Sequence, residues 1–198
     1  MHLQEHYSLK KYNTFGIEIS TRYFAQFDNQ EALKNLLNNH KNIPKLILGG
    51  GSNILFTQNF DGLILYNHIK GIDILKEDKQ QVVIRVGAGE NWADFVAHCV
   101  LKGYTGIENL ALIPGTVGAS PIQNIGAYGV EVKEFIQSVT AININTQHIT
   151  HYPNKACQFE YRNSIFKKEN PKENIILYVN FIFDKQNKTL KLDYGDIQ

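Results

Sequence analysis

The segment that most constrains the fold runs from residue 109 to residue 129. It reads NLALIPGTVGASPIQNIGAYG, with four glycines, two prolines and no Asp, Glu, Lys or Arg. A structureless loop of this length is uncommon inside a compact domain unless it serves a function. Its hydroxyl, amide and backbone groups suit a large, flat, mostly uncharged ligand with hydrogen-bonding edges, such as an isoalloxazine ring. We therefore expect this segment to wrap a ligand; a buried structural loop is the alternative.

A second glycine-bearing segment lies earlier in the chain. Gly49, Gly50 and Gly51 follow a short apolar run and precede Ser52 and Asn53. Because glycine lacks a Cβ, the backbone there can approach a ligand closely. Successive outward N–H groups form an anion-binding nest that suits a pyrophosphate, and Ser52 and Asn53 add side-chain donors. The alternative is a simple tight turn.

Strand-like and helix-like segments alternate along the chain, without internal repeats. There are too few βαβ crossovers for a doubly wound sheet, so the pattern predicts an α+β fold. We expect two lobes, residues 1–68 and residues 69–198, and two hairpins with polar turns at 77–79 and 145–146. The predicted strands cover residues 21–27, 45–48, 62–66, 72–75, 81–86, 136–144, 148–152 and 175–183.

Two helices are expected between these strands. Asn29 and the polar residues after it open the first, and Pro44 ends its pattern. The second covers residues 90–102, with Gly103 at its C-terminal end. Its residues predicted to face the core are Trp92, Phe95, Val96 and Val100.

Composition excludes several classes of partner. The formal net charge of +1 predicts neither a nucleic acid nor an acidic membrane as a partner. No apolar run reaches the roughly 18 residues that a membrane span needs, and the first residues do not read as a signal peptide. Cys99 and Cys157 fit no zinc spacing, and we expect reduced thiols. His148 and His151 would point to opposite faces of a strand, so no metal site is expected.

The remaining motifs exclude other chemistries. Gly87-x-Gly89-x-x-Trp92 imitates the start of the dinucleotide fingerprint but lacks its third glycine and its acidic residue. We interpret it as a strand-to-helix turn. The chain contains no GxxxxGK[ST], HExxH or GxSxG motif, which removes the main support for a nucleotide hydrolase, a zinc peptidase or a serine hydrolase.

Four stretches occur in a fixed order: GGGSNILF, VGAGENW, ENLALIPGTVGASPIQNIGAYG and FEYRNSIFK. In these motifs the chain resembles the UDP-N-acetylenolpyruvoylglucosamine reductase family. The resemblance runs from NTFG at residues 13–16 to YGD at residues 194–196, and the latter is similar to the larger, type I form. It implies a two-lobed FAD-binding fold of the vanillyl-alcohol-oxidase type, followed in the family by a third, substrate-binding domain.

The resemblance also implies an activity. Family members are cytoplasmic oxidoreductases of bacterial peptidoglycan synthesis, and so of cell shape and division. They pass a hydride from NADPH through FAD to the enolpyruvyl group of UDP-N-acetylglucosamine enolpyruvate, which gives UDP-N-acetylmuramate. We expect the UDP-sugar as the small-molecule partner, and a monomer.

Site residues carry over from the family motif by motif. The implied FAD pyrophosphate cradle is Gly49, Gly50, Gly51, Ser52 and Asn53. The residues expected to line the flavin and the rest of the cofactor are Pro114, Gly115, Thr116, Gly118, Ala119, Ser120, Gln123, Asn124, Ile125, Gly126 and Ala127. Those expected near the UDP-sugar are Tyr128, Tyr161, Arg162 and Tyr194.

Arg162 matches the active-site arginine of the family. Hydride addition beside a carboxylate gives an enolate with two charged oxygens, and a planar guanidinium binds such a pair bidentately. Without the resemblance, Arg162 would be an ordinary surface arginine.

The sequence departs from the family at two functional positions. The family uses a serine that protonates the enolate carbon, and a glutamate near its C-terminus, and neither motif occurs here. We therefore expect a fragment without the substrate-binding domain, which binds FAD but turns over substrate poorly or not at all alone. The alternative is a non-catalytic FAD-binding module.

Overall fold

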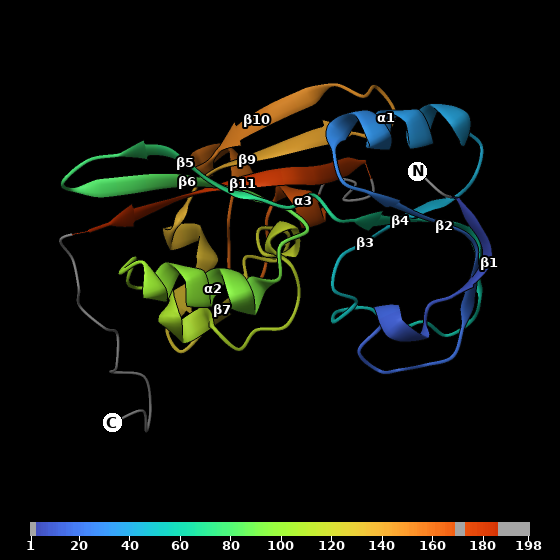
Figure 1. Ribbon diagram of the computed structural model, residues 1–198, viewed down its shortest axis with the longest axis horizontal. Helices are drawn as coiled ribbons and strands as arrows, with labels where there is room; N and C mark the ends of the chain where they lie inside the picture. The colour runs from blue at the N-terminus through green and yellow to red at the C-terminus, as the bar shows by residue number, and fades with distance from the viewer. Residues whose placement is uncertain (1–2, 169–172, 186–198) are drawn as a thin grey trace.

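A computed structural model describes residues 3–168 and 173–185. Within them the chain forms two lobes side by side, each built around one β-sheet (Figure 1). The strands of the first sheet lie between residues 4 and 67, and those of the second between residues 72 and 184. One mixed and one antiparallel sheet with few helices confirm the predicted α+β class.

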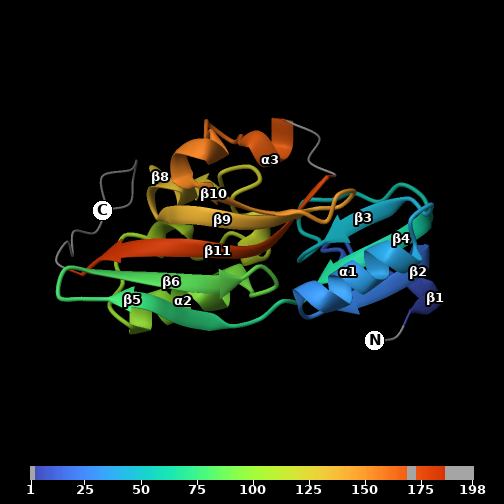
Figure 2. The same cartoon turned by 90° about the horizontal axis from the view of Figure 1, so that it is seen from above.

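The first sheet contains, in spatial order, β1 (Gln4–Ser8), β2 (Ser20–Phe27), β4 (Phe60–Asn67) and β3 (Lys45–Leu48). β1 pairs antiparallel with β2, whereas β2 and β3 each pair parallel with β4. Helix α1 (Gln30–Asn39) covers one face and buries Leu33, Leu36 and Leu37 (Figure 2). The Asn29 side chain accepts a hydrogen bond from the Ala32 amide at 2.9 Å and caps the helix as its polar start predicts.

The second sheet is antiparallel throughout and has the order β10 (Ile149–Pro153), β9 (Ile136–Asn143), β11 (Asn174–Asp184), β6 (Gln81–Gly87) and β5 (Ile72–Glu77). Both predicted hairpins, β5–β6 and β9–β10, are confirmed. The shorter elements of this lobe are η2 (Glu108–Leu110), η3 (Val117–Ala119), β7 (Gly126–Ala127), β8 (Val130–Glu131), η4 (Val132–Glu134), η5 (Asn154–Cys157) and α3 (Ile165–Lys168). The first lobe adds η1 (Lys10–Tyr12).

Helix α2 (Trp92–Leu101) packs against the second sheet, and the Phe95 ring lies 4.6 Å from that of Phe181 on β11. The prediction that Val100 faces the core is wrong, because its side chain is 45% exposed. Cys99 is fully buried instead. Residues 92, 95, 96 and 99 form one helical face, and position 100 lies a further 100° around the helix.

The two lobes share a hydrophobic cluster. Ile142, Ile175 and Leu177 of the second sheet pack with buried residues of the first, including Phe27 and Leu65. A buried hydrogen bond adds to this contact, since Asn67 Nδ2 donates to the Ile176 carbonyl at 2.8 Å. The lobes are therefore packed together as well as linked by the chain.

Asn67→Ala is expected to lower the free energy of unfolding by about 1–3 kcal/mol, because it leaves the buried Ile176 carbonyl and the Ile69 amide without their partner. Asn38→Ala is the control. Asn38 accepts an exposed hydrogen bond from Gln147 across the lobes, so its loss should change stability by less than about 0.5 kcal/mol. Equal losses in urea denaturation would contradict this assignment.

Gly87 ends β6 and Gly89 lies in the turn from β6 to α2, as the interpretation as a strand-to-helix turn predicts. A Cβ on Gly87 would lie 2.3 Å from the Ile69 carbonyl oxygen, and one on Gly89 would lie 2.7 Å from His68 Cα. These glycines allow the turn to pack against the segment that leaves the first lobe.

Both cysteines are free thiols and buried. Burial raises the pKa of Cys157 to about 12. At pH 8 its thiolate fraction should be about 10³-fold below that of an exposed thiol, so alkylation by iodoacetamide should be correspondingly slow until urea unfolds the chain. Modification of Cys157 in the folded protein at the rate of a free thiol would contradict this.

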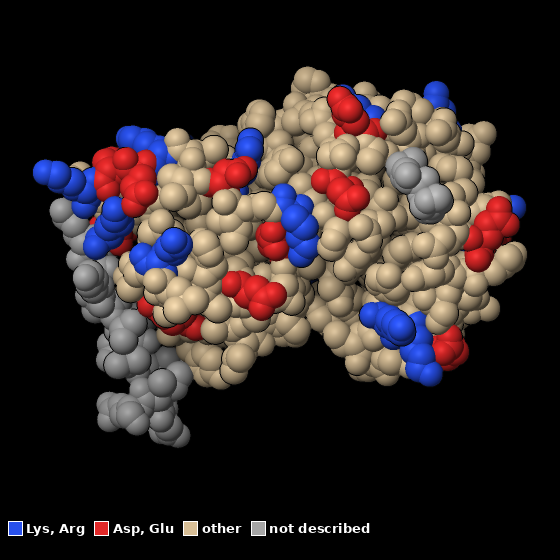
Figure 3. All heavy atoms as spheres, viewed as in Figure 1, with Lys and Arg blue, Asp and Glu red and all other residues tan. Residues whose placement is uncertain are grey.

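Charged residues of both signs are interspersed over the face shown in Figure 3, and the hollow between the lobes is bordered mainly by uncharged residues. Among the residues that the structure describes, none of the helices has the length and apolar character needed to cross a bilayer.

Candidate functional site

The two glycine-bearing segments meet between the lobes. Ser52 Oγ donates a hydrogen bond to the Pro114 carbonyl at 3.1 Å, and Asn53 Nδ2 donates one to Gln123 Oε1 at 3.4 Å. The first segment directly follows β3, and the second comes from the other lobe. Residues more than sixty positions apart in sequence thus form one site.

Small residues let these segments lie close together. A Cβ on Gly49 would lie 2.6 Å from Thr116 Oγ1, and one on Gly50 would lie 3.0 Å from Gly115 Cα. A side chain at either position would push the two loops apart. The glycines therefore set the width of the junction between the lobes.

The first loop also has the features of an anion-binding nest. Gly51 has a φ of +66°, in the left-handed region that glycine adopts without strain. Among the described residues, none accepts a hydrogen bond from the backbone amides of residues 50–53. No carboxylate occurs between Lys45 and Asn59 to repel an anion. Within the described residues, a phosphate group would therefore not have to displace a protein acceptor from these amides.

The segment that contains the NTFG motif is hydrogen-bonded to this glycine loop. The Thr14 amide donates to the Gly51 carbonyl at 3.2 Å. Asn13 is buried, and its side chain donates to the Leu9 and Ile17 carbonyls and accepts from the Ile17 amide. The sequence resemblance begins at this motif, and its contacts explain how it shapes the glycine loop.

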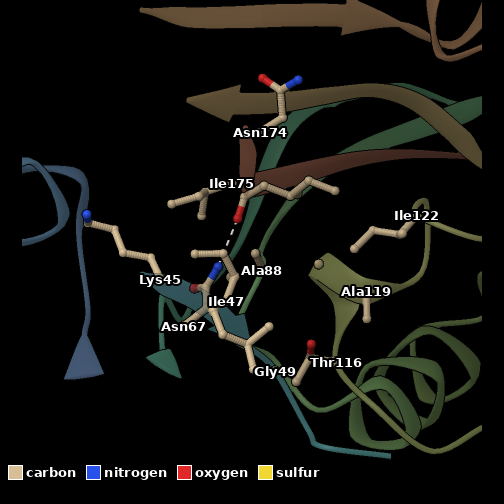
Figure 4. Close-up of a pocket in the computed structure, with 13 residues that line it drawn as sticks. Lys45, Ile47, Gly49, Asn67, Ala88, Thr116, Ala119, Ile122, Asn174 and Ile175 are labelled. Atoms are coloured by element: carbon tan, nitrogen blue, oxygen red, sulfur yellow. Dashed lines mark hydrogen bonds between the residues drawn. The ribbon is translucent and has the colours of Figure 1, made fainter. Parts of the chain in front are cut away.

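A pocket of about 240 Å³ adjoins the junction of the loops (Figure 4). Thr116, Ala119 and Ile122 lie on one side, opposite Lys45 and Ile47 of β3. Its volume is below the roughly 300–1,000 Å³ of a drug-sized ligand site, so it suits one ring-sized part of a dinucleotide. The lining residues are Lys45, Leu46, Ile47, Gly49, Asn67, Ala88, Thr116, Gly118, Ala119, Ile122, Asn174, Ile175 and Ile176.

Most of the strand residues in this lining were missed by the sequence analysis. Ile47, Ile175 and Ile176 have the character of ordinary strand residues, and only the sheet topology brings them together. Lys45 was also missed; its ammonium group donates to the Lys41 and Ile43 carbonyls, and burial lowers its pKa.

Several residues that were expected to line the cofactor have buried side chains. Ser120 Oγ donates to the Val117 carbonyl at 2.8 Å, Asn124 is fully buried, and Ile125 belongs to the core. These three residues are buried as a whole and pack against the protein in this structure. Gly126 and Ala127 form β7, which pairs with β8.

Arg162 lies against the same long loop. It occupies a tight turn in which Glu160 and Asn163 pair, and its φ is +54°. Its Nη2 donates to the Gly126 carbonyl at 2.7 Å, and Ser164 Oγ donates to the Ile122 carbonyl at 2.7 Å. The structure thus brings the predicted arginine to the predicted cofactor loop.

The two described tyrosines expected near a substrate are exposed, Tyr128 by 52% and Tyr161 by 83%. The Arg162 guanidinium lies 6.0 Å from the Tyr161 ring centroid. Tyr128 has a φ of +49°, which is uncommon for an aromatic residue and typical of functional loops. Tyr194 lies outside the described residues.

Comparison with known proteins agrees with this geometry. Residues 21–151 match the model of a family described as FAD binding domain. The chain is 50% identical, over its whole length, to the UDP-N-acetylenolpyruvoylglucosamine reductase of Amoebophilus asiaticus, and it spans 59% of that relative's length.

Solved structures show the same fold. The UDP-N-acetylenolpyruvylglucosamine reductase of Thermus caldophilus matches with a TM-score of 0.70 and 23% identity, over 93% of this chain and 62% of its own. A VAO-type flavoprotein of Myceliophthora thermophila matches with a TM-score of 0.61 and 13% identity, over 82% and 32%. These likenesses confirm the predicted two-lobed flavoprotein fold.

Proposed function

Because the chain belongs to the FAD binding domain family, we propose that it binds FAD between its lobes and serves the reductase reaction after which its curated relatives are named. The reaction is reduction of the enolpyruvyl group of UDP-N-acetylglucosamine enolpyruvate in peptidoglycan synthesis. The observation that carries this proposal is the meeting of the two glycine-bearing segments, with open backbone amides, beside an apolar pocket.

The residues present fit FAD. The amides of residues 50–53, with Ser52 and Asn53, would hold the diphosphate, since they offer donors and residues 45–59 contain no Asp or Glu. The pocket walls from β3, β11 and the long loop would cover an aromatic ring. When bound, FAD would supply hydride transfer from NADPH to the enolpyruvyl double bond.

Arg162 would bind the carboxylate of the enolpyruvyl group. One of its five N–H donors is used at the Gly126 carbonyl, and its exposed guanidinium can offer others to two carboxylate oxygens. Its fixed charge would stabilise the negative charge that develops there during reduction. Tyr128 and Tyr161, which are exposed, and Tyr194 would contact the UDP-sugar.

We also propose a lobe boundary, an oligomeric state and a cellular location for this protein. We place the lobe boundary at residue 68, between the last strand of the first sheet and the first strand of the second. The protein would act as a monomer in the cytoplasm, where the nucleotide-sugar substrate and NADPH would both be available to it.

The natural full-length protein should be purified with bound flavin and assayed for NADPH oxidation. We expect oxidation that depends on UDP-N-acetylglucosamine enolpyruvate and saturates with it. A flavin-loaded protein whose NADPH oxidation ignores the UDP-sugar would contradict the reductase assignment and favour a non-catalytic FAD-binding module.

A further inference from the structure

The Asn124 side chain makes three hydrogen bonds within the protein, one of them to the turn that carries Arg162. It is fully buried, and its φ of +44° lies in the left-handed region. Its Nδ2 donates to Glu131 Oε1 and to the Glu160 carbonyl, each at 2.9 Å, and its Oδ1 accepts from the Lys133 amide at 3.1 Å. Both of its donor hydrogens are therefore used inside the protein.

The bond to Glu160 connects Asn124 to the turn that carries Arg162. Glu160 opens this turn, and its backbone amide and carbonyl both pair with Asn163. Ser164 and Arg162 add bonds to the long loop on either side of Asn124, at Ile122 and Gly126. Asn124 and Ser164 are themselves fully buried and their bonds are part-buried, whereas the bond made by Arg162 is exposed.

We propose that Asn124 is a positioning residue that fixes the Arg162 turn on the cofactor loop, in place of the cofactor contact expected from the sequence. This inference rests on the proposed function, in which Arg162 binds the carboxylate of the substrate. The bond from Nδ2 to the Glu160 carbonyl sets where the guanidinium lies. An arginine displaced by about 1 Å from its working position can cost roughly 10²-fold in rate.

The test is Asn124→Gly in the flavin-loaded full-length protein. Glycine keeps the positive φ without strain and removes only the side-chain bonds. We expect kcat for the UDP-sugar reaction to fall about 10- to 100-fold, with flavin content unchanged. Independently of activity, amide hydrogen exchange in residues 158–166 should become faster while the strands of both sheets stay protected.

Asn154→Ala is the matched control. Asn154 Nδ2 also donates to two backbone carbonyls, those of Lys133 and Ile136, and neither carbonyl belongs to the Arg162 turn. Its loss should lower stability and leave kcat and the exchange of residues 158–166 unchanged. If Asn124→Gly does not fold, Ser164→Ala, which removes the neighbouring tether, should show the same local exchange and a smaller loss of kcat.

The outcomes separate this inference from the proposed function. A wild-type protein without substrate-dependent NADPH oxidation would refute the proposed function, while hydrogen exchange would still test whether Asn124 fixes the Arg162 turn. An active wild type with normal kcat and normal exchange in Asn124→Gly would refute the role of Asn124 alone. Equal effects of Asn124→Gly and Asn154→Ala would overturn it too, because they would show a general loss of stability.

Discussion

Replacing Arg162 with alanine in the full-length protein is expected to lower kcat for the UDP-sugar about 10²- to 10³-fold. Under the proposed function, this variant loses a fixed positive charge that would face the developing enolate, an effect of the size seen when one oxyanion donor is removed. Flavin content should stay close to wild type, because the Arg162 guanidinium is exposed and its hydrogen bond to the cofactor loop, at the Gly126 carbonyl, is exposed as well. Steady-state NADPH oxidation and the flavin absorbance spectrum together measure both quantities.

Two further variants serve as controls for Arg162→Ala. Lys167→Ala removes a neighbouring exposed cation, whose ammonium group donates to the Arg162 carbonyl, and should leave kcat within about two-fold of wild type. Arg162→Lys keeps the charge but not the planar fork, so it should recover only part of the rate. If Arg162→Ala loses flavin and turnover in equal proportion, Arg162 has a structural role instead.

Gly51→Ala is expected to have the largest effect on cofactor binding, about a 100-fold or greater loss of FAD affinity. The new Cβ would lie 2.0 Å from the Tyr12 carbonyl oxygen, a backbone atom that cannot rotate away, and φ is +66°. The loop must therefore move, and its amides would leave the nest. The free energy of unfolding should also fall by about 2–4 kcal/mol through overpacking and strain.

Gly16→Ala is the matched control for Gly51→Ala. Gly16 has nearly the same φ, +63°, but nothing lies within 4 Å of its added Cβ. It should show the strain of the left-handed conformation alone, about 1 kcal/mol, with FAD affinity unchanged. Equal FAD affinities in the two variants would mean that the position of the Gly51 loop is unimportant for the cofactor.

Most strands and helices could be predicted because their hydrophobic patterns are strong. The apolar runs at 45–48 and 175–183 and the capped start at Asn29 lie where expected. β1 was missed because its residues are mostly exposed and show no alternation. Its pairing with β2 is a tertiary contact with no local signature. The prediction for Val100 was wrong because the buried face of α2 includes Cys99 and not the next residue, Val100.

Part of the site could be predicted because glycine-rich segments indicate places where the backbone lies close to a ligand or to another segment. Both segments could be identified from sequence, and the structure brings them together. The pocket wall from β3 and β11 could not be identified, because it depends on how the two sheets are placed. The burial of Asn124 could not be predicted either. The sequence of a loop does not show whether an asparagine side chain faces a ligand or the protein.

Titration of the purified chain with FAD, followed by quenching of flavin fluorescence, tests the central claim most directly, with riboflavin titrated in parallel. We expect saturation at one FAD per chain and an affinity for FAD at least about 100-fold above that for riboflavin, since at least two charge-assisted bonds to the diphosphate would be missing from riboflavin. Circular dichroism would show that the protein is folded. If the folded protein binds neither flavin, or binds both with equal affinity, the result would contradict a diphosphate cradle between the lobes.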